Sequence, residues 1–209
     1  MLTALEFFID NITGFMAWNL FLAFIPLVFS IFLFNRRSRR NILWWLGLVI
    51  FILFLPNAAY VITDIIHFVS DVRNPDIPPN GIIFLIIPQY IIFILAGFQC
   101  HVLSVMAIIN YLRRQGIVSK RNGIIGMELG INLLTAYGVY LGRFNRLNSW
   151  YIVTRPERLV YEVIDSFMRG NFLLAMFIFF VTITCLYYIF KWIDISIIAW
   201  WQRGKLTKS

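Results

Sequence analysis

Long apolar stretches separated by short polar segments dominate the pattern of the chain. Five of them reach the length of about 20 helical residues that a bilayer requires. The pattern predicts an all-α fold, a polytopic helical membrane bundle with about five transmembrane helices, in a single integral membrane domain over residues 1–209. The expected spans cover residues 12–34, 42–68, 82–109, 123–141 and 171–190. Pro26 and Pro56 predict kinks in the first and second spans.

Two peripheral elements follow from periodicity. From Pro156 to Arg169 the apolar residues recur at helical spacing and the charged residues occupy the other face. This pattern predicts an amphipathic helix in the last external loop, with Pro156 at its first position. After the fifth span, Trp192, Trp200 and Trp201 predict an interfacial anchor over residues 191–201.

Composition and charge agree with a membrane location. The chain is 60% hydrophobic and 13% charged, whereas about a quarter of the residues of a soluble domain carry charge. The net charge of +8 would suit nucleic acid, but the arginines cluster in short segments between apolar stretches. Positive-inside topology signals belong at those places. We therefore expect membrane lipids as partners and no nucleic acid.

The distribution of charge along the chain also predicts orientation. The loops at 35–41 and 111–122 and the C-terminal tail are basic, whereas the N-terminus and the loop at 70–80 carry acids. Alternating these segments across five spans places the N-terminus outside and the C-terminus inside. Segment 143–170 is an exception, because it would be external yet holds five arginines and three acids. Those arginines either have a function or bind outer-leaflet phosphates nonspecifically.

The second span carries a polar stripe near its outer end. If this segment is helical, Asn57, Tyr60, Asp64 and His67 lie within an arc of about 80°. Polar groups near hydrocarbon cost free energy, so such a stripe points to a structural or functional need. Counted from the start of the span, the hydrocarbon should end near Ile62. Asp64 and His67 would then lie at the outer water boundary.

Asp64 and His67 are the candidate catalytic residues. An Asp and a His three residues apart can share a proton, orient a nucleophilic water or supply two ligands to a metal. Alternatively, Asp64 and Thr63 can form local hydrogen bonds or pair with an arginine, and so fix the end of the helix. A single Asp–His pair offers too few ligands for a metal. We expect neither a metal nor a cofactor.

The fourth span offers a partner for this stripe. Small residues at 126–130 and at 138–142 let another helix approach closely. We expect this helix to pack near the second span, where Arg143 or Arg146 would meet Asp64. One acid cannot neutralise two arginines, so a surplus positive charge would be left for an anionic ligand.

Glu128 is a further acid inside the fourth span. It shares a helical face with Asn132 and Thr135 and lies near the cytoplasmic end of the span. It lies toward Arg113, Arg121 and His101, and we expect an interface salt bridge in preference to a proton relay.

Two polar segments together carry a family resemblance. LPNAAYVITDIIHF at 55–68 and GRFNRLNSW at 142–150 resemble a family of bacterial multi-pass membrane proteins that is described only as a domain of unknown function. The resemblance covers most of the chain and implies the bacterial cytoplasmic membrane. It implies these site residues: Pro56, Asn57, Tyr60, Thr63, Asp64, His67, Arg143, Arg146, Asn148, Ser149 and Trp150. The family pattern has an acid after Asn-Ser-Trp, and Tyr151 stands there, which weakens a catalytic role.

The sequence favours binding over catalysis. The leading hypothesis is an external polar site for an anionic group, such as a lipid headgroup or an envelope-precursor phosphate. Its expected ligand-binding residues are Asn57, Tyr60, Asp64, His67, Arg143, Arg146, Asn148, Ser149 and Trp150. One alternative is an enzyme acting on an envelope lipid, with His67 as general base and Asp64 orienting it. The other is a non-catalytic accessory or assembly subunit, so a protein partner or a homo-oligomer in the membrane stays open.

Overall fold

The chain is helical throughout the part that the structure describes. This structure, a computed structural model, describes residues 2–35, 40–145, 154–168 and 170–206, and no strand occurs in these ranges. The all-α fold class is confirmed. The elements are α1 (Leu2–Asn11), η1 (Ile12–Met16), α2 (Ala17–Leu33), α3 (Ile42–Tyr60), η2 (Val61–Asp64), α4 (Ile65–Val72), α5 (Pro79–Gly81), η3 (Ile82–Ile86), α6 (Ile87–Arg114), α7 (Arg121–Phe144), α9 (Pro156–Met168) and α10 (Phe172–Leu206).

Five helical segments of the described chain are long and apolar enough to cross a membrane, which confirms the expected number. They are Ala4–Leu33, Ile42–Val72, Pro79–Arg114, Arg121–Phe144 and Phe172–Arg203. The first three contain 30, 31 and 36 residues, which corresponds to about 45–54 Å of helix. Hydrocarbon is only about 30 Å thick. These three segments must therefore tilt strongly or extend beyond the hydrocarbon.

The long segments stay helical because π-helical and 3₁₀ turns join their α-helical parts without a loop. The π-helical turn η1 joins α1 to α2, and Pro26 lies inside α2 without ending it. The 3₁₀ turn η2 joins α3 to α4, five residues after Pro56. A proline removes one backbone donor and crowds the preceding turn, and a tighter turn nearby accommodates this change.

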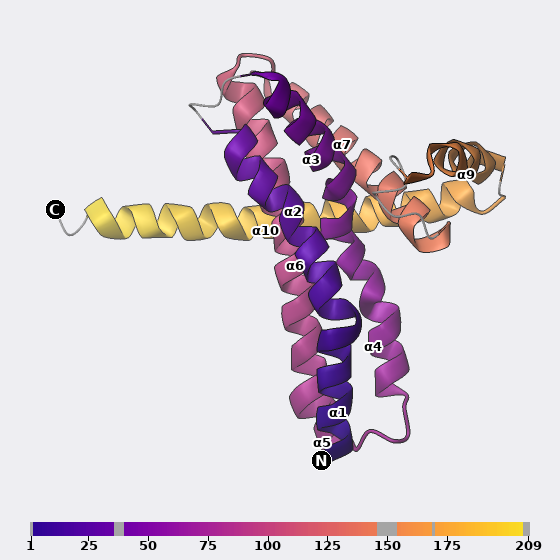
Figure 1. Cartoon of the computed structure of the whole chain (residues 1–209). Coiled ribbons are helices and arrows are strands. Elements are labelled where there is room, and N and C mark those ends of the chain that lie inside the picture. The colour runs from indigo at the N-terminus through magenta and orange to yellow at the C-terminus, as the bar shows by residue number, and fades with distance from the viewer. Residues whose placement is uncertain (1, 36–39, 146–153, 169, 207–209) are drawn as a thin grey trace.

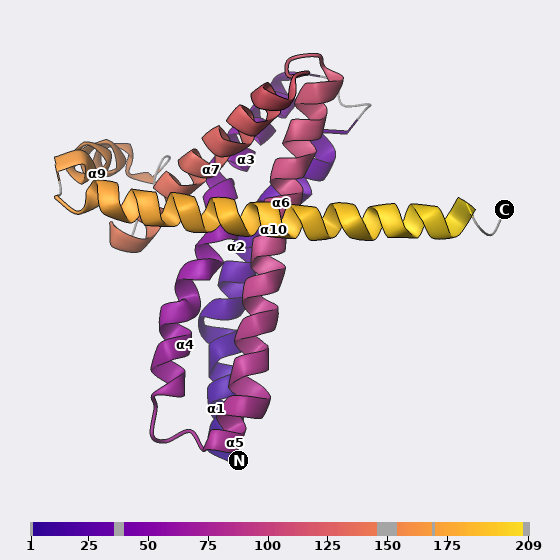
Figure 2. The ribbon, with the colours of Figure 1, turned by 180° about the vertical axis from the view of Figure 1, so that it is seen from behind.

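The last span differs from the expected one. We predicted a span at 171–190 followed by a separate anchor, but α10 is one continuous helix of 35 residues. Residues 190–201 contain no glycine or proline that would end it. In Figures 1 and 2, α10 lies across α6, and its C-terminal part extends beyond the other helices. The five helices therefore cannot share one tilt in a bilayer.

The basic connections lie at the same end of the bundle. In Figure 1 the end of α2 and the start of α3 lie beside the α6–α7 connection, and the start of α1 and the α4–α5 connection lie at the opposite end. Arg40 Nε donates a hydrogen bond of 2.8 Å to Tyr111 Oη, and Arg114 donates to the Phe34 carbonyl. These contacts tie α2, α3 and α6 together at their basic end.

Two glycines allow the helices around η2 to approach closely. A Cβ at Gly97 of α6 would lie 2.7 Å from Val61 Cγ1, and a Cβ at Gly138 of α7 would lie 2.6 Å from Pro56 Cβ. A Cβ at Gly126 or at Gly130 would meet nothing within 4 Å. The expected close approach thus occurs at Gly138 and not over residues 126–130, where that face of α7 is exposed.

The expected amphipathic helix is present as α9. Its apolar residues Val160, Ile164 and Phe167 are exposed, as an interfacial helix requires. It is held to the end of α7 by polar contacts: Asn145 Nδ2 donates to Glu162 Oε2 over 2.9 Å, and the hydroxyls of Tyr137 and Ser166 lie 3.3 Å apart.

Candidate functional site

The 3₁₀ turn η2 divides the polar stripe of the second span. A 3₁₀ turn advances about 120° per residue instead of 100°, so four residues change the helical register by about 80°. Asp64, at the end of η2, is 1% exposed, whereas His67 on α4 is exposed. Asn57 and Tyr60, on the last turn of α3, are half-buried. The stripe is therefore part buried and part exposed.

Asp64 is anchored to the first span. Asn19 Nδ2 on α2 donates a hydrogen bond of 2.8 Å to Asp64 Oδ2. Within the described ranges no residue donates to the other carboxylate oxygen. Thr63 donates instead to the Tyr60 carbonyl over 2.7 Å, which closes the 3₁₀ turn. Asp64 is thus buried and only half satisfied by protein donors.

A second asparagine–aspartate contact lies two turns further along the same helices. Asn11 Nδ2 donates to Asp71 Oδ2 over 2.7 Å, and Tyr90 Oη of α6 donates to the same oxygen over 2.9 Å. The sequence reasoning missed Asn11, Asn19 and Tyr90. The only signal was the spacing of eight residues between the two asparagines in an apolar segment, which nearly matches the seven between Asp64 and Asp71.

His67 does not form a hydrogen-bonded pair with Asp64. Its ring packs against Phe15, with the two ring centroids 4.8 Å apart. His67 still interacts electrostatically with Asp64. Among the described residues, however, none hydrogen-bonds to either ring nitrogen of His67. In this arrangement Asp64 does not orient the imidazole.

Arg143 lies on the last turn of α7 and reaches the same region. It is half-buried and interacts electrostatically with Asp64. It forms no hydrogen bond or ion pair with any residue in the described part of the chain. The helix α7 ends at Phe144, two residues before Arg146. Arg146, Asn148, Ser149 and Trp150 lie outside the described residues.

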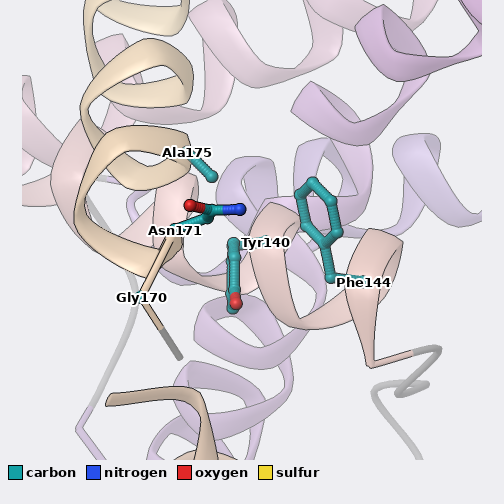
Figure 3. Close-up of a pocket in the computed structure, with 5 residues that line it drawn as sticks. All are labelled: Tyr140, Phe144, Gly170, Asn171 and Ala175. Atoms are coloured by element: carbon teal, nitrogen blue, oxygen red, sulfur yellow. The ribbon is translucent and has the colours of Figure 1, made fainter. Parts of the chain in front are cut away.

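An open apolar cavity lies between the end of α7 and the start of α10 (Figure 3). Its volume is about 320 Å³. The lining residues are Tyr140, Phe144, Gly170, Asn171 and Ala175.

Two other features bear on the chemistry of the chain. In the described ranges, no three His, Cys, Asp or Glu residues lie together as a metal would need. Glu128 does not pair with Arg113 or Arg121, which we had expected; it pairs with Lys191 of α10 and accepts a hydrogen bond of 3.0 Å from Tyr187 Oη. Lys191 comes directly after the expected end of the fifth span, and it was not among the expected partners of Glu128.

Replacing Asn19 with leucine is expected to lower the free energy of unfolding by about 1–3 kcal/mol, because buried Asp64 would lose its described donor. Unfolding in detergent micelles, followed by tryptophan fluorescence, measures the change. The double variant Asn19→Leu/Asp64→Leu removes donor and acceptor together and should recover most of the loss. If the double variant loses as much stability as Asn19→Leu and Asp64→Leu added together, the contact does not contribute to stability.

The fold and this site define an all-α, multi-pass membrane protein with a polar region between its first, second and fourth spans. The chain belongs to the family described as "Protein of unknown function (DUF1361)", whose sequence pattern matches residues 18–185. The matched range includes Asn19, Asp64 and Arg143. The expected membership of a family of unknown function is confirmed. No curated protein and no solved structure matches the chain.

Proposed function

We propose that the region between Asp64 and Arg143 is an external site that binds an anionic group, such as a lipid headgroup or an envelope-precursor phosphate. The chain would be a single integral domain of the bacterial cytoplasmic membrane, with its N-terminus outside and its C-terminus inside. The gathering of basic connections at one end of the bundle supports this orientation, since positively charged loops stay in the cytoplasm.

One observation carries the proposal: Arg143 is half-buried, and its guanidinium makes no hydrogen bond or ion pair with the described residues. A guanidinium has five N–H donors in a planar fork that matches phosphate and carboxylate oxygens. Burying those donors without acceptors costs free energy. An anionic ligand would supply the acceptors and the compensating charge.

The environment of Asp64 explains why Arg143 keeps donors available. Asn19 already donates to one oxygen of Asp64, and Arg143 approaches this carboxylate only within electrostatic range. Asp64 would attract and position the guanidinium without accepting hydrogen bonds from its N–H groups. Arg146 would add a second positive charge, so that the site carries an excess over Asp64 alone.

The other expected ligand-binding residues have secondary roles in this proposal. Asn57 and Tyr60 are half-buried on the turn before η2, and His67 is exposed on the turn after it. They would contact the polar part of a ligand held by Arg143. Asn148 and Ser149 would donate hydrogen bonds, and Trp150 would lie at the membrane interface. These roles follow from the sequence motif.

Binding is preferred to catalysis because of His67. A general base needs an orienting partner and access to the proton that it removes. His67 is accessible but packs on Phe15 and is not hydrogen-bonded to Asp64. The non-catalytic accessory role has one observation in its favour, the two asparagine–aspartate contacts that join α1 and α2 to η2 and α4. That role predicts lost stability, not lost binding, when the site is mutated.

Arg143→Ala is expected to weaken binding of short-chain phosphatidylglycerol roughly 10- to 100-fold, since hydrogen bonds to a charged group contribute about 1.5–3 kcal/mol. Native mass spectrometry of the micelle-embedded protein measures the dissociation constant. Arg143→Lys keeps the charge without the planar fork, so its dissociation constant should lie between those of the unmodified protein and Arg143→Ala. Competition by inorganic phosphate distinguishes a site for the phosphate alone from a site for the whole lipid.

The matched control is Arg113→Ala, which removes one positive charge from an exposed position at the basic end of α6. Binding should be unchanged in this variant. Equal affinity in Arg143→Ala and in the unmodified protein would contradict the proposal, and equal loss in both arginine variants would reduce it to nonspecific attraction.

A further inference from the structure

A second polar cluster lies between α6, α7 and α10, away from the Arg143 region. His101 Nε2 of α6 lies 3.1 Å from Asn132 Oδ1 of α7. One turn earlier on α7, Glu128 accepts hydrogen bonds from Tyr187 and Lys191 of α10. These two sets of contacts lie one turn apart on α7 and together involve three helices.

Several polar atoms of this cluster have no protein partner in the described part of the chain. On α6 and α7 they are Glu128 Oε2, Asn132 Nδ2, His101 Nδ1 and Thr135 Oγ1, and the four residues that carry them are between 0% and 2% exposed. Tyr188 Oη of α10 also has no hydrogen bond by distance and angle, and it interacts electrostatically with Glu128. Glu128, Asn132 and Thr135 follow one another at helical spacing along one face of α7, so their unpartnered atoms share that face.

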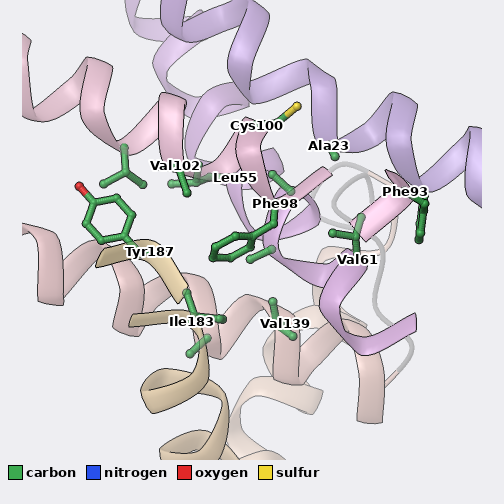
Figure 4. Packing of buried hydrophobic residues seen from close by; sticks show 14 of the residues in the cluster. Ala23, Leu55, Val61, Phe93, Phe98, Cys100, Val102, Val139, Ile183 and Tyr187 are labelled. Atoms are coloured by element: carbon green, nitrogen blue, oxygen red, sulfur yellow. The ribbon is translucent and has the colours of Figure 1, made fainter. Parts of the chain in front are cut away.

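Apolar side chains pack around the buried part of the cluster, whereas the Lys191 side chain at its edge is 22% exposed. In Figure 4 the ring of Tyr187 lies beside Val102, Leu55 and Phe98, and these residues are buried. A buried polar atom without a partner is destabilising, and nearly all such atoms in folded proteins are hydrogen-bonded. Four of them on adjacent residues indicate that something not supplied by the protein satisfies them.

The chemistry of the four atoms selects the ligand. Lys191 already compensates the charge of Glu128, which disfavours a cation, and the carboxylate disfavours an anion. The unpartnered set combines an acceptor on Glu128 with a hydroxyl and an amide that donate. Exchanging the two amide atoms of Asn132 would still leave one of them unpartnered. Water both donates and accepts, and buried waters usually make about three such bonds.

We propose that the face of α7 formed by Glu128, Asn132 and Thr135 is an internal water site, closed by His101 of α6 and by α10. Glu128 and Thr135 are seven positions apart on α7, about 10 Å along the helix, so the site needs more than one water. One water completes the hydrogen bonding of the Glu128–Lys191 pair and so helps dock α10 on α7, and another binds the Thr135 hydroxyl. The site is independent of the anion site, because Glu128 and Arg143 are 15 positions apart on α7, about 22 Å along the helix.

Thr135→Val tests the proposal, because the direction in which it shifts the thermal midpoint of unfolding depends on whether water is bound. Valine keeps the shape of threonine and removes only the hydroxyl. If water binds the Thr135 hydroxyl, the substitution removes a hydrogen bond, and the thermal midpoint in lipid nanodiscs should fall. If the hydroxyl is dry and unpartnered, its removal should leave the midpoint unchanged or raise it, and that result would overturn the proposal.

Thr63→Val is the matched control, because the buried hydroxyl of Thr63 has a protein acceptor, the Tyr60 carbonyl. It sets the direction and size of the shift for a satisfied threonine, and Thr135→Val should shift the midpoint in the same direction. A structure that resolves ordered water provides a second measurement. Water density within hydrogen-bonding distance of Glu128 Oε2 and Asn132 Nδ2 is expected, and a dry site in such a map would contradict the inference.

Discussion

Lys191→Met is expected to lower the free energy of unfolding by about 3–5 kcal/mol, the usual cost when one partner of a buried ion pair is removed. Glu128 is 1% exposed and would lose its countercharge inside the bundle. Glu128→Gln should cost less, because the Lys191 side chain is 22% exposed and its ammonium group can turn toward water. Unfolding in mixed micelles, followed by tryptophan fluorescence, measures both variants.

The double variant Lys191→Met/Glu128→Gln is the control for this prediction. It removes both charges and leaves a side chain that still accepts the hydrogen bond of Tyr187, so it should recover a large part of the loss. If the two single variants lose equal stability and the double variant loses their sum, the ion pair does not hold α10 to α7.

Gly138→Ala is expected to destabilise the protein by about 1–3 kcal/mol, because an inserted methyl group overpacks a tight contact. The new Cβ would lie 2.6 Å from Pro56 Cβ, and the proline ring cannot rotate away. The result would show that α7 rests directly on α3 beside the anion site. The same unfolding measurement in micelles applies.

Gly130→Ala, on the same helix, provides the matched comparison. A Cβ there meets nothing within 4 Å, so the substitution should be neutral or should stabilise α7 by up to about 1 kcal/mol through helix propensity. Similar losses at Gly130 and Gly138 would indicate a general intolerance of α7 to alanine and would contradict the packing between Gly138 and Pro56.

The sequence predicted most of the fold because membrane helices are encoded locally. Apolar stretches gave the number of spans, and the periodicity after Pro156 gave α9. The lengths of the spans were underestimated, since the first helical segment begins before residue 12, α4 continues to Val72 and α6 continues to Arg114. The continuity and steep crossing of α10 could not be predicted, because crossing geometry depends on tertiary packing.

The candidate site was predictable only in part, for a similar reason. Motif spacing pointed to Asp64 and Arg143, and the structure brings these residues within electrostatic range. The donor to Asp64 is Asn19, a single amide in an apolar helix that no local pattern marks. The packing of His67 against Phe15, and not against Asp64, is a contact between different helices that motif spacing does not specify.

The most direct test of the central claim is a cryo-electron microscopy structure of the protein in native-membrane nanodiscs. The anion site predicts phosphate density within hydrogen-bonding distance of the Arg143 guanidinium, on the side of η2 where Asp64 lies, and loss of that density in Arg143→Ala. A map in which Arg143 closes directly onto Asp64, with no density between them and the surrounding lipid resolved, would contradict the claim.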